Sequence, residues 1–436
     1  MRALIQYEIR KMLTDSAAKY LCALLIGLIT FNIYTVISEY SCGITDFSFD
    51  RFFTGRRYYG LKAVQEVKKR YRNYTADYSE FSVKNLRAAY NAQKKLNEDF
   101  AKKAAEEGAQ WSAVLRNELM ERNSAKLDEV YPSQLQAFLS LVSAGIDKSE
   151  PVEQAVPDNM YEMLFDIRAY QTAATESESE QQLLRQKCDE LSVPFRFGYC
   201  EGWSRLSLSM EKLLKWLPAL MMAFFMLILK YENESGMEEL SFTTRYGRTK
   251  GVYAKIIAGV GAAVLFYTAA SVIYAAGIFS ILGVEGGIYP VQIVPVSFYF
   301  GMPVYSINLI QCCLLQYFLG LLVTVSAVLA LFFAFSLFRN YVSAFVISLI
   351  MYYGINLFSK FFPSMSDSPL QKYIEGIGVN ALNMVHNFCG LIQNGDFIWF
   401  FGIPVLRMYG LIIIYAGLSF MLAVLTMYRY GRCKVR

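Results

Sequence analysis

Residues 220 to 225 read Leu-Met-Met-Ala-Phe-Phe and residues 411 to 414 read Leu-Ile-Ile-Ile, and these two stretches decide the fold. Both are continuous apolar runs, without the alternation of apolar and polar residues that a strand of a membrane barrel requires. They predict helices that lie among apolar neighbours or in lipid. The whole chain agrees, because 55% of its 436 residues are hydrophobic and only 18% are charged, which is too apolar for a soluble protein of this size.

The apolar residues gather in six blocks along the chain. A helix rises about 1.5 Å per residue, so roughly 20 apolar residues cross the hydrocarbon layer of a membrane. The blocks meet or approach this length, and the longest overhangs the membrane or begins with an interfacial turn. The sequence therefore predicts an all-α, polytopic membrane protein with about six transmembrane helices, near residues 20–38, 213–229, 252–283, 304–338, 341–358 and 408–428.

Orientation follows from the basic residues near the ends of these blocks, since cytosolic loops carry an excess of Lys and Arg. If six spans are counted, four groups of basic residues fall on one side of the membrane. They lie before the first span, between the second and third, between the fourth and fifth, and after the last. The opposite loop at 284–303 has no basic residue. We therefore expect a protein of the cell membrane with both termini in the cytosol.

A long charged segment separates the first two blocks. Residues 43–212 carry 24 of the 42 Lys and Arg and 26 of the 37 Asp and Glu, a net charge of −2. Long domains cross the membrane largely regardless of charge, so we expect an extracytoplasmic domain with its own core here. The chain then divides into residues 1–42 with an interfacial helix and the first span, 43–212 as the outer domain, and 213–436 with five further spans.

The outer domain is expected to be helical. Leu86, Ala89, Leu96 and Phe100 recur at helical spacing and predict one buried stripe. Further helices are expected at about 109–129 and 160–192. Breaks are expected at the prolines, because proline removes a backbone donor and disfavours helix in the residue before it (Pro132, Pro151, Pro157 and Pro194).

The residues that carry enzyme chemistry are largely missing. No Gly-Lys dipeptide occurs anywhere in the chain, so a phosphate-binding P-loop is excluded. His386 is the single histidine, which excludes a multi-histidine metal site. We expect no catalytic residue, no metal, no cofactor on this chain and no nucleic-acid partner.

The loop between the second and third blocks is the most informative polar stretch. Four acids (Glu232, Glu234, Glu238 and Glu239) are followed by four bases (Arg245, Arg248, Lys250 and Lys255), with glycines between them as turn points. One interpretation is a solvated, charge-balanced loop that joins two helices. The other is a docking surface for a cytosolic partner.

This loop resembles the corresponding loop in type-2 permeases of ATP-binding-cassette exporters. Those permeases have an acid, a glycine, a leucine, a run of small residues that ends in arginine, and a lysine at the start of the next span. Glu234, Gly236, Leu240, Arg248 and Lys255 hold those places here, although this chain has Thr243-Thr244-Arg245 where the family usually has a proline. The plan of six spans, the large insert and an apolar outer segment before the last span are also similar to that family.

The resemblance implies a role in transport. The partner would be a separate cytosolic ATPase chain, which binds ATP and Mg, and a second permease subunit would complete a homodimer or heterodimer. Residues 232–248, with Glu232 and Arg245, would contact the ATPase. An amphipathic N-terminal helix around Arg10 and Lys11 would lie on membrane lipid.

Three amides stand out among the later blocks. Asn308 and Gln311 lie one helical turn apart, and Asn356 lies in the fifth block. These amides and Gln316 are candidates either for a translocation path or for hydrogen bonds between helices. The small residues of the third block (Gly259, Gly261, Ala262, Ala263, Ala269 and Ala270) predict a close-packed helix face.

The cysteines raise one further question. Cys42 follows the first span and Cys200 precedes the second, so both should lie where the ends of the outer domain converge, and a disulfide between them is geometrically plausible. The alternative is that these two thiols and Cys188 stay free.

Two other function classes stay open. A membrane-anchored sensor or scaffold, whose outer domain binds a ligand, fits the same architecture. A secondary transporter would usually show acids deep in its spans, and none is found. The outer domain, with its balanced charge, suggests a peptide, lipid-like or other amphipathic substrate, and either direction of transport fits.

Overall fold

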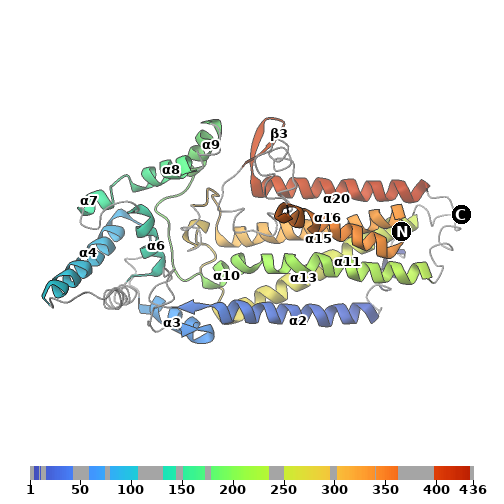
Figure 1. Cartoon of the computed structure of the whole chain (residues 1–436), viewed down its shortest axis with the longest axis horizontal. Helices are drawn as coiled ribbons and strands as arrows, with labels where there is room; N and C mark the ends of the chain where they lie inside the picture. Colours follow the sequence, from blue (N-terminus) through green and yellow to red (C-terminus); the bar gives the residue numbers. More distant parts are fainter. Residues whose placement is uncertain are drawn as a thin grey trace.

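The structure is a computed structural model of the whole chain. It describes residues 4–8, 10, 16–42, 58–73, 79–106, 131–143, 151–171, 178–234, 250–294, 302–338, 340–361 and 397–432. Six long helices lie side by side and form what we call the helix bundle (Figure 1). They are α2 (Ser16–Glu39), α11 (Glu211–Glu234), α13 (Val252–Leu282), α15 (Leu309–Phe338), α16 (Tyr341–Phe361) and α20 (Arg407–Arg432).

The described residues include five helices that are long and apolar enough to cross a membrane. They span Lys19–Glu39, Glu201–Tyr231, Val252–Leu282, Leu309–Phe338 and Arg407–Tyr430. The remaining bundle helix, α16, has 21 residues, of which Tyr341–Tyr352 counts as a shorter apolar helix. The prediction of an all-helical, polytopic protein is confirmed at this level. Both ends of the chain lie at one end of the bundle, and the inserted domain lies at the other (Figure 1).

Helix α15 is the centre of the bundle. It packs against α11, α13, α16 and α20, and 78% of the residues in its most apolar stretch are buried within the protein. Helix α2 lies at the edge of the bundle, where it packs against α11 and α13 and also contacts α3, and only 33% of its most apolar stretch is buried. Large apolar side chains that remain exposed on α2 and α20 face outward from the bundle, where lipid would cover them (Tyr20, Leu24, Phe31, Tyr34, Ile413, Phe420 and Met421).

Close packing of α13 against α15 depends on a small residue. A Cβ added at Gly259 would lie 2.5 Å from Cε2 of Phe332, whereas one at Gly261 would meet no atom within 4 Å. Ala262, Ala263 and Ala270 are buried, and Gly261 and Ala269 are exposed. The predicted small-residue face is therefore present, but only part of it forms the contact.

In the described part of the inserted domain, six helices precede the short helix α10 (Glu201–Ser209). These are α3 (Gly60–Asn73), α4 (Val83–Glu106), α6 (Ser133–Val142), α7 (Val152–Ala155), α8 (Met160–Gln171) and α9 (Glu178–Asp189). Helix α4 contains the predicted stripe, and its Leu86 and Ala89 are buried. Pro132 and Pro151 directly precede α6 and α7. Within the predicted helix at 160–192 the structure describes two helices, α8 and α9, and the whole of the one predicted at 109–129 lies outside the described residues, as does His386.

Aromatic rings fill the centre of the inserted domain. The ring of Phe81 stacks on Phe138 at 4.4 Å and on Phe197 at 4.5 Å between centroids. The hydroxyl of Tyr161 donates to the carbonyl of Phe81 at 2.8 Å and accepts from the backbone N–H of Phe195 at 3.1 Å. These bonds join the start of α4 to the chain that leaves α9. Burial raises the pKa of Tyr161 above its ordinary value, so this hydroxyl stays protonated.

This core is shared with later parts of the chain. Residues between α13 and α15 pack into the same cluster (Val291, Ile293, Val294, Met302, Val304 and Tyr305), together with Leu309 at the start of α15, Leu406 and Met408. Gln292 holds that segment together, since its buried amide donates to the carbonyls of Pro303 and Tyr305, both at 2.9 Å. The inserted domain is therefore completed by residues far beyond 212.

Two small antiparallel sheets are the exceptions to an all-helical chain among the described residues. Strand β1 (Ser41–Cys42) pairs with β2 (Tyr58–Tyr59) where the chain enters the inserted domain. Strand β3 (Phe397–Phe400) pairs with β4 (Ile403–Leu406), with Phe397 opposite Leu406 and Phe400 opposite Ile403. This second hairpin is the apolar segment that the sequence places before the last span.

Candidate functional site

The junction between the inserted domain and the bundle brings together residues from distant parts of the sequence. The chain leaves α2 at Glu39, forms the inserted domain, and returns through α10 into α11. Helix α10 packs against α13 and α15. The contacts at this junction join the inserted domain to the bundle, in addition to the core that it shares with residues 291–309.

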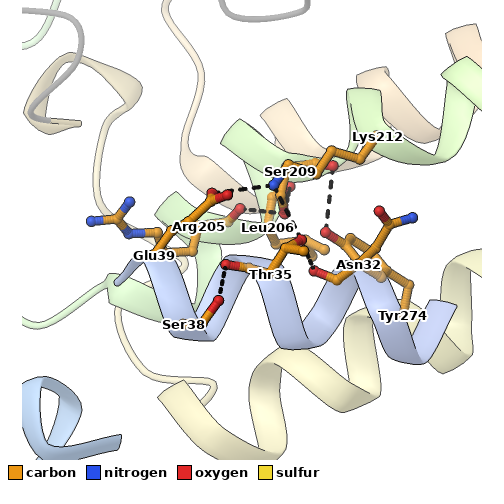
Figure 2. A network of polar contacts seen from close by, with 9 residues as sticks. All are labelled: Asn32, Thr35, Ser38, Glu39, Arg205, Leu206, Ser209, Lys212 and Tyr274. Carbon is orange, nitrogen blue, oxygen red and sulfur yellow. Dashed lines mark hydrogen bonds and ion pairs between the residues drawn. The ribbon is translucent and has the colours of Figure 1, made fainter. Parts of the chain in front are cut away.

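One lysine ties α2 to α11 at the ends of these helices next to the inserted domain (Figure 2). Nζ of Lys212 lies 3.5 Å from Oε2 of Glu39 and 3.5 Å from Oγ1 of Thr35. The Thr35 hydroxyl donates to the carbonyl of Asn32 at 2.8 Å. Because Glu39 is largely exposed, this ion pair contributes at most about 1 kcal/mol and mainly fixes the distance between the two helices.

The next residue, Tyr40, is buried where the chain turns into the inserted domain. The guanidinium of Arg205 lies 4.7 Å from the centroid of its ring, and Arg205 in turn lies 3.8 Å from the Glu201 carboxylate. Burial raises the pKa of Tyr40 far above its usual range, and the neighbouring Glu201 carboxylate adds to that rise. Tyr40 therefore stays neutral, and it links the first residue after α2 to α10.

The carboxyl end of α13 is held by the inserted domain. The last carbonyls of a helix have no partner inside the helix and need other donors. Here Lys68 of α3 donates to the carbonyl of Ile281 at 3.0 Å and the Tyr199 hydroxyl donates to that of Leu282 at 2.5 Å. Trp203 Nε1 donates to the carbonyl of Val284 at 2.8 Å.

Two further features make this contact close. The lysine charge complements the negative end of the α13 dipole, and Nζ of Lys68 also lies 6.0 Å from the centroid of the Tyr199 ring. The start of α10 lies directly on the end of α13, since a Cβ at Gly202 would be 1.9 Å from the carbonyl oxygen of Gly283. Gly283 itself has φ 94°, which favours glycine and ends the helix.

A buried polar cluster joins α10 to the central helix. Gln316 of α15 is fully buried, and its amide donates to both the carbonyl and the hydroxyl oxygen of Ser207 at 3.2 Å. The Ser207 hydroxyl also lies 3.5 Å from the sulfur of Cys312. The interpretation of Gln316 as a hydrogen bond between helices is confirmed. Such bonds contribute about 0.6 to 2 kcal/mol in membranes.

Asn308 and Gln311 make a different kind of contact from either predicted one. The backbone N–H of Gln311 donates to Oδ1 of Asn308 at 2.9 Å, and the backbone N–H of Asn308 donates to Oε1 of Gln311 at 3.0 Å. This reciprocal pair caps the start of α15. Its local bonds give both residues a structural role, and a place in a translocation path stays a prediction. Asn356 lies in α16, and its side chain is outside those described.

Most of the loop that would meet an ATPase lies outside the described residues, including Gly236, Leu240, Arg245 and Arg248. Glu232 and Glu234 form the end of α11, without described side chains. Lys255 lies in the first turn of α13, as the sequence predicts, with Nζ 6.0 Å from the centroid of the Phe335 ring. At the N-terminus, residues 4–8 and Arg10 are helical, and Lys11 is outside the description.

The two candidate cysteines lie at the same junction. Cys200 directly precedes α10, is buried, and is a free cysteine in the structure. Cys42 pairs with Tyr58 through β1 and β2, and its side chain is not described. Because Tyr40 contacts Arg205, the two ends of the inserted domain do converge as expected. The disulfide stays a prediction.

With this geometry in place, the chain was compared with known proteins. No family model, no curated protein and no solved structure matches it. Within the described part of the chain, no group of three or more His, Cys, Asp and Glu could hold a metal ion. The functional argument therefore rests on the junction and on the sequence.

Sequence reasoning missed the residues that form the junction. Lys68 and Ile281 are 213 positions apart, and no local pattern pairs them. One signal was present: an apolar run that ends at Gly283 predicts a helix C-terminus, whose carbonyls need donors. The donors themselves could be found only from the three-dimensional arrangement.

Proposed function

We propose that this chain is the membrane-spanning permease subunit of an ATP-binding-cassette exporter. In this proposal the protein lies in the cell membrane with six spans, counting α16, and with both termini in the cytosol. The inserted domain is then outside the membrane, at the end of the bundle away from the termini. A separate cytosolic ATPase supplies the energy, and a second permease subunit completes the assembly.

The observation that carries the proposal is the fixed junction at the end of α13. An exporter alternates between two arrangements of its spans, so an outer domain that takes part must move together with at least one of them. Lys68, Tyr199 and Trp203 bind three carbonyls at the end of α13, and Lys212 ties α2 to α11. The inserted domain therefore contacts the end of α13 directly, and the lysine couples two neighbouring helices of the bundle beside that contact.

The opposite end of the bundle supports the same proposal. The acidic and basic loop follows α11 and precedes α13, and its residues are those that resemble the ATPase-docking loop of type-2 permeases. A push on this loop would act on the start of α13. The far end of that helix, which is 31 residues long, is the end held by the inserted domain.

One experiment separates this function from a membrane-anchored sensor or scaffold. The full chain is purified from its native membranes in lipid nanodiscs, and the proteins bound to it are identified by mass spectrometry. We expect an ATPase subunit in stoichiometric amount and ATP hydrolysis that transported substrate stimulates. Recovery of the chain without any ATPase, while its inserted domain binds a ligand, would instead favour the sensor.

A further inference from the structure

The β3–β4 hairpin is unusual for an exposed hairpin because it carries no charged or amide side chain. Its ten residues from Phe397 to Leu406 read Phe-Ile-Trp-Phe-Phe-Gly-Ile-Pro-Val-Leu. The turn is formed by Phe401 and Gly402, with φ values of 51° and 85°. Two positive φ values give the tight turn whose twist matches the strands, and such turns favour Asn-Gly or Asp-Gly. Here a phenylalanine takes the position that a polar residue usually holds.

The tip of this hairpin is exposed. Phe401 has 106% of its reference exposure and Ile403 has 65%. Trp399, on the adjoining strand, has 45%. In water a cluster of this kind would be unfavourable, since each large apolar side chain left exposed forgoes the gain of burial. The composition of the hairpin therefore indicates an apolar or interfacial environment.

Contacts between the hairpin and α20 fix the position of the hairpin tip along the axis of this helix. A Cβ at Gly410 would lie 3.0 Å from Cδ1 of Ile398 and 3.3 Å from Cε2 of Phe400. Glycine thus lets the hairpin lie against the first turn of α20, which begins at Arg407. Gly410 lies three residues after the start of α20, which is about 5 Å of helix rise. Phe400, the residue before the turn, therefore lies level with the first turn of this span. Figure 1 shows the hairpin beside that end of α20, projecting away from the rest of the bundle.

We propose that the β3–β4 hairpin is a membrane anchor, which inserts Phe401 and Ile403 among the lipids of the leaflet at the inserted-domain end of the bundle. The exposed apolar side of α20, with Ile413 and Phe420, continues the same surface along the membrane. Aromatic residues favour this interfacial depth.

A photo-crosslinking experiment identifies what covers the tip. The photoreactive residue benzoylphenylalanine replaces Phe401 in the full chain, which is reconstituted in phosphatidylcholine nanodiscs and irradiated. The matched controls place the same residue at Phe420, on the exposed side of α20, and at Val193, an exposed position in the inserted domain. Intact-mass spectrometry then reports the adduct on each variant.

We expect a lipid adduct at position 401 with at least half the yield at position 420, and less than a tenth of that yield at position 193. A crosslink from position 401 to a second copy of the chain or to another protein would overturn the proposal. So would a yield at position 401 as low as that at position 193. Because the tip side chain is exposed, its replacement should leave the fold intact; the same measurement at Ile403 decides the matter if it does not.

Discussion

The contact between α13 and α15 makes a quantitative prediction about one glycine. Replacing Gly259 with alanine places a methyl group 2.5 Å from Cε2 and 2.8 Å from Cζ of Phe332. Non-bonded carbon atoms prefer about 3.5 to 4.0 Å, so the ring must move by roughly 1 Å. The ring has little room, because it also packs on Phe225 of α11 with 5.4 Å between centroids. The strain therefore reaches a third helix.

The size of the effect follows from a matched comparison with Gly261→Ala. Both substitutions favour helix by about 1 kcal/mol relative to glycine, so this term cancels between the two variants. Gly261 is exposed, and an added Cβ there meets nothing within 4 Å. Overpacking of a well-packed core costs about 1 to 3 kcal/mol. We therefore expect Gly259→Ala to be less stable than Gly261→Ala by about 1 to 3 kcal/mol.

The assay is reversible unfolding of the reconstituted protein, followed by steric trapping or by titration with denaturing detergent in mixed micelles. A third variant, Gly259→Ala with Phe332→Leu, should recover part of the loss, because the smaller side chain makes room for the methyl group. Equal stability of Gly259→Ala and Gly261→Ala, within about 0.5 kcal/mol, would refute the close contact between the two helices.

Three further predictions concern the junction, the loop and the cysteines. Lys68→Met should speed deuterium exchange at the end of α13 by about 10- to 150-fold, since a hydrogen bond from a charged donor contributes about 1.5 to 3 kcal/mol. Lys69→Met, at an exposed neighbour on the same helix, should leave exchange unchanged, and equal effects of the two substitutions would contradict a bond from Lys68 to α13. Arg248→Ala or Glu234→Ala should leave the protein folded but remove substrate-stimulated ATP hydrolysis by its partner, and intact stimulation in both variants would argue against ATPase docking. Burial raises the pKa of the Cys200 thiol above its ordinary value, so in the reduced protein iodoacetamide at pH 8 should alkylate it far more slowly than a free cysteine. Non-reducing peptide mapping of protein purified in air tests for a disulfide between Cys200 and Cys42. Free thiols at both positions would exclude this bond.

The helices of this protein are largely readable from its sequence. A continuous apolar run has few alternatives to a helix in a membrane, and α13 at Val252–Leu282 agrees with the expected block at 252–283 to within one residue. Prolines act through local backbone chemistry, so Pro132 and Pro151 mark helix starts without any tertiary information.

The tertiary contacts were not readable in the same way. Gln316 could be assigned to a hydrogen bond between helices, but its partner, Ser207, lies in a segment assigned to the outer domain. The β3–β4 hairpin was expected only as an apolar segment, because Phe401 gives no turn signal and Gly402 alone is ambiguous. In both cases the missing information was which distant segments the fold brings together.

The shared core of the inserted domain constrains the order in which this protein can be made. The aromatic centre around Phe81 and Phe138 is synthesised early, yet it packs with Val304, Tyr305 and Leu309, which follow two further membrane helices. A nascent chain that ends before residue 309 therefore holds this apolar cluster only partly covered. During biogenesis the inserted domain cannot complete its core until α15 is inserted. Until then it exposes apolar surface, which chaperones on its side of the membrane can recognise. Residues 43–212 expressed alone would remain in that incomplete state.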